Sequence, residues 1–288
     1  MDLSFVLLIE LLYAIASLIL ISSGLAVVFG MMKVINLAHG EFIMMGGFVT
    51  IVAENAGVNI FVAMLLVAPI TVGLIGLVVE RLIIRHLYGR LIDTMLATWG
   101  LSLFFVGLVT MIFGNTTTSI TTPITGFSVG DYQVNGYNFF VILVAISLVT
   151  SMYIFLKTTR FGLIARGTMQ DPDIATALGY SPARVYMATF FCGSALSGLA
   201  GAVLAPLVGL VPSSGATYIA KAFITVIGGG PSLIFGLVSS SAGFGLVNQF
   251  FTFYISPVYG EVALLISAVV LLRVMPQGIT GKYFRGKM

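Results

Sequence analysis

Long apolar runs, separated by short polar stretches, fill almost the whole chain. A membrane-spanning helix needs about 20 apolar residues. The runs that reach or come close to this length are residues 5–29, 61–79, 95–113, 139–156, 186–210 and 233–253, and a run of 11 residues at 262–272 follows before the C-terminal tail. We expect Ser22, Ser23 and Gly24 to interrupt the first run. The pattern predicts an all-α polytopic membrane protein with roughly eight transmembrane helices.

Two shorter apolar pieces, residues 42–53 and 218–230, form a weak internal repeat. The sequence AHGEFIMMGG at 38–47 aligns with AKAFITVIGG at 220–229. Paired short segments interrupted by glycine are typical of broken helices that line a transport site near the middle of a membrane. We therefore expect two broken-helix segments, one in each half of the chain.

Composition and charge support a membrane protein and suggest its orientation. Charged residues make up 8% of the chain, against about 25% in soluble domains, and the mean hydropathy is +1.12. All Lys and Arg except Lys33 and Lys221 lie in three regions, residues 81–90, 157–184 and 273–287. By the positive-inside rule these regions face the cytoplasm, whereas residues 55–59 and 114–136 face outward. The side of the N-terminus stays open.

The polar segment at residues 159–179, TRFGLIARGTMQDPDIATALG, stands out from its apolar surroundings. Asp171 is a good N-cap, and Pro172 suits the first helical position, where no N–H is needed. The next residues fill about two turns, and Gly179 supplies a left-handed end. We interpret this stretch as a short helix outside the bilayer that docks into a soluble partner. The residues expected at this contact are Ile174, Ala175, Ala177 and Leu178.

A few polar residues lie near membrane depth, where ionisable groups usually face the bundle interior or an aqueous path. They are Asn36, His39, Glu41, Thr98 and Lys221. Either a structural polar network or a translocation path explains them, and Lys221 can pair with Glu41 or Glu261 or extend to the interface. Too few ligands surround His39 for a metal site. No Ser or Cys nucleophile accompanies His39 and Glu41, and the GGGP run lacks the Lys-Ser/Thr ending of a phosphate loop. We expect no catalytic activity.

Four motifs of the chain resemble those of one transporter family. These are GLAVVFGMMKVINLAHGEFIMMGGF at 24–48, TRFGLIARGTMQDPDIATALGYSPARV at 159–185, YIAKAFITVIGGGPSLIFG at 218–236 and LLRVMPQGITG at 271–281. Together they resemble the membrane permease subunits of the branched-chain amino-acid class of ABC importers, whose close relatives carry urea and short amides. Residues 80–103 look nearer to the urea and amide permeases.

This resemblance implies one transmembrane permease domain over residues 1–288, with a cytoplasmic coupling loop at 157–185. It implies a bacterial inner-membrane location, two cytoplasmic ATPase subunits that bind ATP–Mg, a second permease subunit forming a heterodimer, and a periplasmic substrate-binding protein. No cofactor is expected in this chain and no nucleic-acid partner. Arg160 and Arg166 would anchor the coupling loop on lipid headgroups or on acidic residues of the partner. A passive channel for urea or another small solute and an intramembrane enzyme using His39 and Glu41 remain alternatives.

Overall fold

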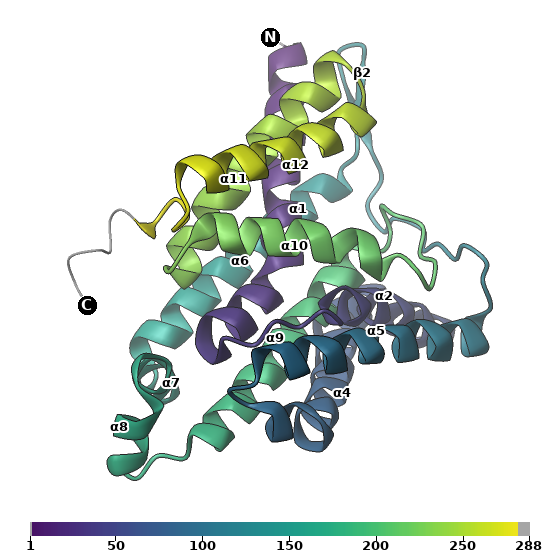
Figure 1. Ribbon diagram of the computed structural model, residues 1–288. Helices are drawn as coiled ribbons and strands as arrows, with labels where there is room; N and C mark the ends of the chain where they lie inside the picture. The colour runs from purple at the N-terminus through teal and green to yellow at the C-terminus, as the bar shows by residue number, and fades with distance from the viewer. Residues whose placement is uncertain (1, 282–288) are drawn as a thin grey trace. The chain divides into compact units, whose positions relative to one another are not determined.

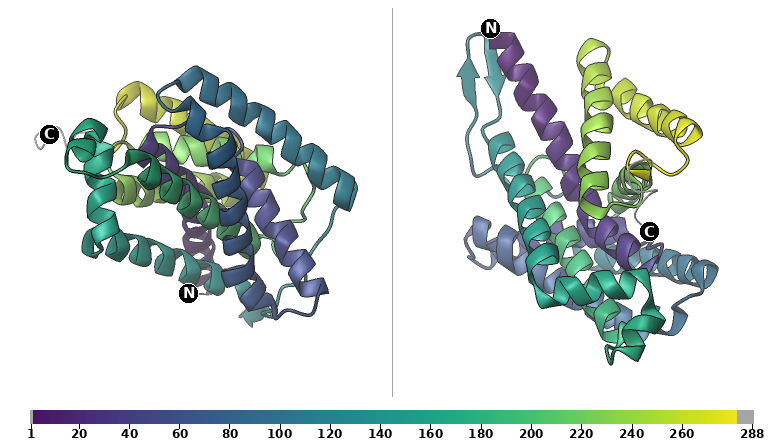
Figure 2. Two further views of the ribbon diagram at one scale, coloured as in Figure 1. Left: turned by 90° about the horizontal axis from the view of Figure 1, so that it is seen from below. Right: turned by 90° about the vertical axis from the view of Figure 1, so that its left-hand side faces the viewer.

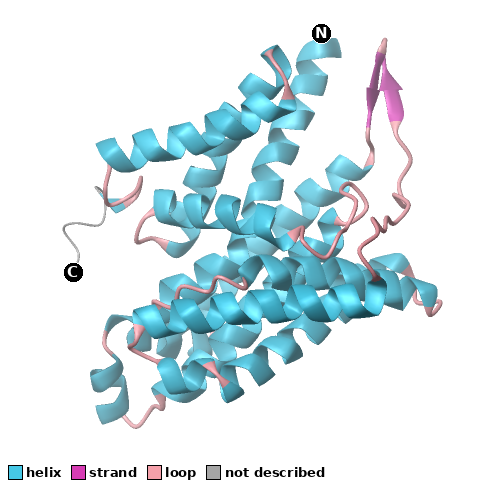
Figure 3. Cartoon of the chain, turned by 45° about the vertical axis from the view of Figure 1, so that its right-hand side comes forward, coloured by secondary structure: helices cyan, strands magenta, loops and turns pink. Residues whose placement is uncertain are grey.

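The computed structural model describes residues 2–281, and helices dominate them (Figures 1 and 3). In chain order the elements are α1 (Asp2–Met32), α2 (His39–Asn55), α3 (Ile60–Val62), the π-helical turn η1 (Ala63–Val67), α4 (Ala68–Leu82), the 3₁₀ turn η2 (Ile84–Leu87), α5 (Leu91–Phe113), β1 (Phe127–Val129), β2 (Tyr132–Val134), α6 (Tyr137–Thr158), α7 (Arg160–Gln170), α8 (Pro172–Ala177), α9 (Pro182–Leu204), α10 (Gly215–Gly229), α11 (Leu233–Tyr254) and α12 (Pro257–Val274).

Seven helical stretches in the described part of the chain are long and apolar enough to cross a membrane. They are α1, the continuous stretch from α3 to α4, α5, α6, α9, α11 and α12. The two segments of the expected repeat form the shorter helices α2, with 17 residues, and α10, with 15. The prediction of an all-α polytopic membrane protein is confirmed.

The first helix contradicts one expectation, because α1 runs without interruption through Ser22, Ser23 and Gly24. These small residues are buried, and a Cβ on Gly24 would collide with the Gly193 carbonyl and the Ser197 hydroxyl. They serve close helix packing, which small side chains allow in membranes, and do not break the helix. The break follows Met32 instead, where Lys33 adopts a φ of 53°.

The loop between α5 and α6 contains a short β-hairpin that its Thr/Gly/Asn-rich composition did not predict. Its strands pair antiparallel, with Phe127 opposite Val134 and Val129 opposite Tyr132. Gly130 at the turn has a φ of 59°, and a Cβ there would lie 2.6 Å from a carboxylate oxygen of Asp2. The hairpin therefore lies beside the beginning of α1 (Figures 2 and 3).

The chain divides into two compact units. One comprises residues 2–22, 121–149 and 221–281, and the other comprises residues 23–120 and 150–220. In the first unit α11 packs against α12, with Phe244 and Leu264 in a small buried cluster. In the second unit α2, α4 and α9 pack together, and the buried ring of Phe42 makes edge contacts with Phe105 and Phe190.

Helices α2 and α9 approach so closely that only glycine fits at several contact points. A Cβ on Gly46 would collide with the backbone of Gly198, and a Cβ on Gly201 would collide with the carbonyl of Ile43. In lipid, where no hydrophobic force drives helices together, such backbone proximity is a main source of helix association. This contact fixes the position of α2 within its unit.

Gly201→Ala tests this contact, with Gly107→Ala as the matched control. The first change forces α9 away from α2, and we expect it to destabilise the protein by about 1–3 kcal/mol, as overpacking does. Gly107 also lies in a membrane helix but has open space around its Cβ position. Thermal unfolding in detergent should therefore show a lowered apparent Tm for Gly201→Ala alone. Equal melting of both variants would contradict the packing account.

Candidate functional site

The chain between α1 and α2 is held by polar side chains. Asn36 Oδ1 accepts a hydrogen bond from the Ala38 N–H at 3.1 Å. Thr98 Oγ1, on α5, accepts one from the Leu37 N–H at 3.1 Å, and this hydroxyl also lies 3.3 Å from the Ile35 carbonyl oxygen. Irregular backbone at membrane depth needs such partners because lipid offers none. Asn36 and Thr98 thus satisfy the backbone groups that the break leaves free.

The start of α2 is held in the same way, by two serines from other helices. Ser197 Oγ, on α9, lies 3.2 Å from His39 Nδ1. Ser102 Oγ, on α5, donates to Glu41 Oε1 at 2.8 Å. His39 and Glu41 are both buried, and Glu41 Oε2 has no hydrogen-bond partner among the described residues. The sequence predicted neither contact, because the two serines lie 158 and 61 residues from their partners.

The structure therefore brings together four of the five residues expected on the path, Asn36, His39, Glu41 and Thr98, in one unit. The fifth, Lys221, belongs to the other unit, and its Nζ lies 2.5 Å from Glu261 Oε1. Of the two carboxylates considered as its partner, Glu261 is the one it contacts. That these five residues line a path stays a prediction.

The polar segment after α6 forms two short helices, α7 and α8. Asp171 Oδ1 accepts hydrogen bonds from the Asp173 N–H at 2.9 Å and the Ile174 N–H at 3.0 Å, which makes it the predicted N-cap. Gly179 has a φ of 87°, as a left-handed helix end requires. Helix α7, which the sequence did not predict, has its own cap, because Thr159 Oγ1 accepts from the Gly162 N–H at 3.0 Å.

Fewer of the residues expected at the partner contact of α8 are exposed than the sequence predicted. Ile174 is 59% exposed and Leu178 is 70% exposed, whereas Ala175 is only 6% exposed. Ala175 therefore packs inside its own chain and is removed from the expected contact surface. Ala177 is exposed. These three exposed residues lie outside every segment that could span a membrane.

The two arginines expected to anchor this loop lie on α7. Arg160 and Arg166 are exposed, and Arg166 Nε donates to the Gly162 carbonyl at 3.3 Å. Neither makes an ion pair with a carboxylate in the described part of the chain. Both are therefore placed where a headgroup or an acidic partner could reach them, and the anchoring role stays a prediction.

Glu80, a buried carboxylate of α4 that the sequence did not single out, holds the loop that follows α4. The Tyr88 hydroxyl donates to Glu80 Oε1, and the Tyr88 ring makes an edge contact with Tyr186 of α9, with ring centroids 5.0 Å apart. Burial and this hydrogen bond to Glu80 raise the pKa of Tyr88 above its ordinary value. The hydroxyl therefore stays protonated and keeps donating at physiological pH. The contact ties this loop to the beginning of α9.

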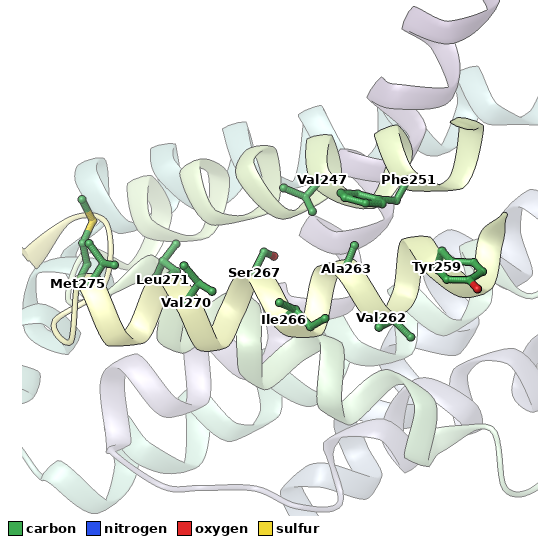
Figure 4. A pocket seen from close by; sticks show the side chains of 11 residues that line it. Val247, Phe251, Tyr259, Val262, Ala263, Ile266, Ser267, Val270, Leu271 and Met275 are labelled. Carbon is green, nitrogen blue, oxygen red and sulfur yellow. The ribbon is translucent and has the colours of Figure 1, made fainter. Parts of the chain in front are cut away.

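A groove of about 640 Å³ lies between α11 and α12 (Figure 4). Val247 and Phe251 of α11 face it from one side, and α12 lines the other. Apart from Ser267 and Tyr259 its side chains are apolar, so it offers little to a polar solute. Among residues 2–281 no group of three or more His, Cys, Asp or Glu side chains could hold a metal ion.

The apolar helices and the buried polar residues at the α1–α2 break define a multi-pass membrane protein. Residues 7–275 match the family model described as "Branched-chain amino acid transport system / permease component". The chain therefore belongs to this family of transport permeases.

Curated relatives agree with the family. The "High-affinity branched-chain amino acid transport system permease protein LivH" of Escherichia coli K12 is 29% identical over 280 residues, covering 91% of each chain. The "Probable branched-chain amino acid transport permease protein LivH" of Methanocaldococcus jannaschii is 27% identical, covering 92% of this chain and 88% of its own. Among solved structures, a chain of "PsaBC from Streptococcus pneumoniae in complex with Fab" aligns with a TM-score of 0.53 at 16% identity, covering 97% of this chain and 94% of that one. That likeness concerns the fold alone.

Ser102→Ala tests the support of Glu41, because it removes the one side-chain donor that the Glu41 carboxylate has within the described residues. A buried group left unsatisfied costs about 1–3 kcal/mol, so the apparent Tm in detergent should fall. Ser267→Ala is the control, since within residues 2–281 Ser267 bonds only the Leu264 carbonyl of its own helix. Equal melting temperatures for the two variants would show that Ser102 does not support Glu41.

Proposed function

We propose that the chain is one permease subunit of a binding-protein-dependent ABC importer in a bacterial inner membrane. It would move a small amino-acid-like solute of the branched-chain class. The family and the names of its curated relatives support the substrate class. The observation that carries the proposal is the capped helix α8, which is exposed outside the spans.

The energy for transport would come from partner subunits. We found no phosphate-binding motif in the sequence, so ATP–Mg would bind two cytoplasmic ATPase subunits. Leu163, Ile174, Leu178 and Tyr180 are exposed apolar residues near one another in sequence on the α7–α8 loop. Contiguous exposed apolar patches mark interaction sites, and Ile174 and Leu178 lie about one helical turn apart. The ATPase would receive Ile174 and Leu178 in a cleft, with Arg160 and Arg166 at its rim.

The position of α8 in the chain suggests how a displacement of α8 by a docked partner would be transmitted to the membrane helices. Helix α9 begins at Pro182, a few residues after α8 ends. Along its length α9 packs against α2 and α4, and it carries the Ser197 that contacts His39. A displacement of α8 would thus pull on the helix that supports the broken segment. A second permease subunit, forming a heterodimer, and a periplasmic binding protein would complete the importer.

A pull-down with the tagged chain distinguishes this proposal from the alternatives. The importer should bring down ATPase subunits, whereas a passive channel would not. Uptake assays with leucine and urea then separate the amino-acid permease from a urea or short-amide permease. Leucine uptake that depends on ATP supports the proposal, and urea uptake alone contradicts the substrate class.

Ala177→Arg tests the docking role of α8. A long charged side chain on this exposed position should keep the ATPase from seating, so uptake and stimulated ATP hydrolysis should fall to background while the permease stays folded in the membrane. Thr158→Arg is the control, because it adds the same charge at the exposed end of α6. Wild-type uptake by Ala177→Arg would contradict docking at α8.

Asp171→Ala should weaken the same coupling without blocking the surface. Loss of this N-cap costs a helix about 1 kcal/mol, and a helix as short as α8 has little else to hold it. We expect fewer solute molecules transported per ATP hydrolysed, with normal membrane insertion. An unchanged ratio would mean that helicity of α8 is not needed for coupling.

A further inference from the structure

The unit formed by residues 2–22, 121–149 and 221–281 contains a partly open cavity of about 300 Å³. This is the lower end of the roughly 300–1,000 Å³ range of ligand pockets. One face of α1 lines it, and single stretches of α10, α11 and α12 complete it. Its charged and amide-bearing lining residues are Glu10, Lys221, Asn248, Gln249 and Glu261.

Both signs of charge meet in this cavity. Lys221 Nζ donates to Glu261 Oε1 at 2.5 Å. Glu10 Oε1 accepts a hydrogen bond from Asn138 Nδ2 at 3.0 Å. An ammonium group has three protons to donate, and within the described residues Glu261 takes one of them. Each of these groups can therefore bind a further polar partner without losing the one it has.

Charges inside apolar helices are costly and usually mark the path of a substrate. Glu10, Lys221 and Glu261 lie on helices that are otherwise almost entirely apolar. The Lys221–Glu261 pair alone accounts for two of them but not for Glu10, which also faces the cavity. Leu18, Ile21 and Leu264 also line the cavity and add apolar surface to it.

We propose that this cavity binds the solute in transit and that the solute is an α-amino acid in its zwitterionic form. Lys221 holds the carboxylate, Glu10 holds the ammonium group, and the aliphatic side chain packs on Leu18, Ile21 and Leu264. This inference rests on the proposed importer function and adds its substrate site. A neutral amide such as urea has no use for fixed charges of both signs, so the cavity favours an amino acid.

The position of the cavity fits an entry site. Glu261 lies in the first turns of α12, while Arg273 lies in the last turn of the same helix. The positive-inside rule places the end bearing Arg273 in the cytoplasm. The cavity therefore opens nearer the outer surface, where a solute delivered from outside would arrive first.

The test uses the importer assembled with its ATPases, partner permease and binding protein in proteoliposomes, with labelled L-leucine uptake and ATP hydrolysis measured together. Lys221→Met should lower leucine uptake about tenfold or more, the effect of losing one charged hydrogen bond, while ATP hydrolysis continues. Lys221→Arg should retain most uptake. Glu10→Gln should also lower uptake, and Glu54→Gln, an exposed acid at the end of α2, is its control.

A charge swap separates binding from a purely structural pair. The double variant Lys221→Glu with Glu261→Lys restores the ion pair and the fold but places a carboxylate where the solute carboxylate binds, so uptake should stay low. Wild-type uptake by this double variant, or by Lys221→Met, would overturn the inference. If the wild-type importer hydrolyses ATP but takes up no amino acid, the proposed function itself fails, which is a different result.

Discussion

Close backbone contact between helices α2 and α9 is the constraint on which the unit of residues 23–120 and 150–220 depends. Gly46 and Gly201 leave no room for a side chain between these helices, and Gly24 does the same between α1 and α9. Because lipid provides no hydrophobic force between helices, this packing and the buried hydrogen bonds must hold the unit together. Helices α8 and α9 are almost contiguous in the chain. Under the proposed function, a force on α8 would therefore be transmitted to α9.

The buried polar residues at the α1–α2 break hold the structure together, whatever part they take in transport. Asn36 and Thr98 satisfy the backbone at the α1–α2 break, and Ser102 and Ser197 hold Glu41 and His39. Of these contacts, Ser197–His39 is the one that involves α9, so it is the one that a displacement of α9 would change. The unit formed by residues 2–22, 121–149 and 221–281 carries charges of another kind, gathered around a cavity and only partly satisfied by one another. That difference is why we assign the solute to the charged cavity.

The sequence predicted those features of the structure that depend on residues close together in the chain. Asp171, Pro172 and Gly179 bound α8 because caps and helix ends depend on neighbouring residues. The apolar runs predicted the candidate spans because the length and hydropathy of a span are also properties of one continuous stretch of chain. The sequence could not show that Ser22–Gly24 are packing residues, that Ala175 faces inward, or that Ser197 reaches His39, because each depends on a helix far away in the chain. The small-residue run around Ser197 was the available signal, but it indicated close packing without naming a partner.

The central claim is that this chain cannot move solute without a partner that supplies energy. The most direct measurement is flux of labelled leucine into liposomes that contain the purified chain alone, compared with liposomes that contain the full assembly and ATP. The account predicts flux above background only with the assembly and ATP. Leucine flux down its gradient through the chain alone, at a rate that ATPase subunits do not change, would contradict it.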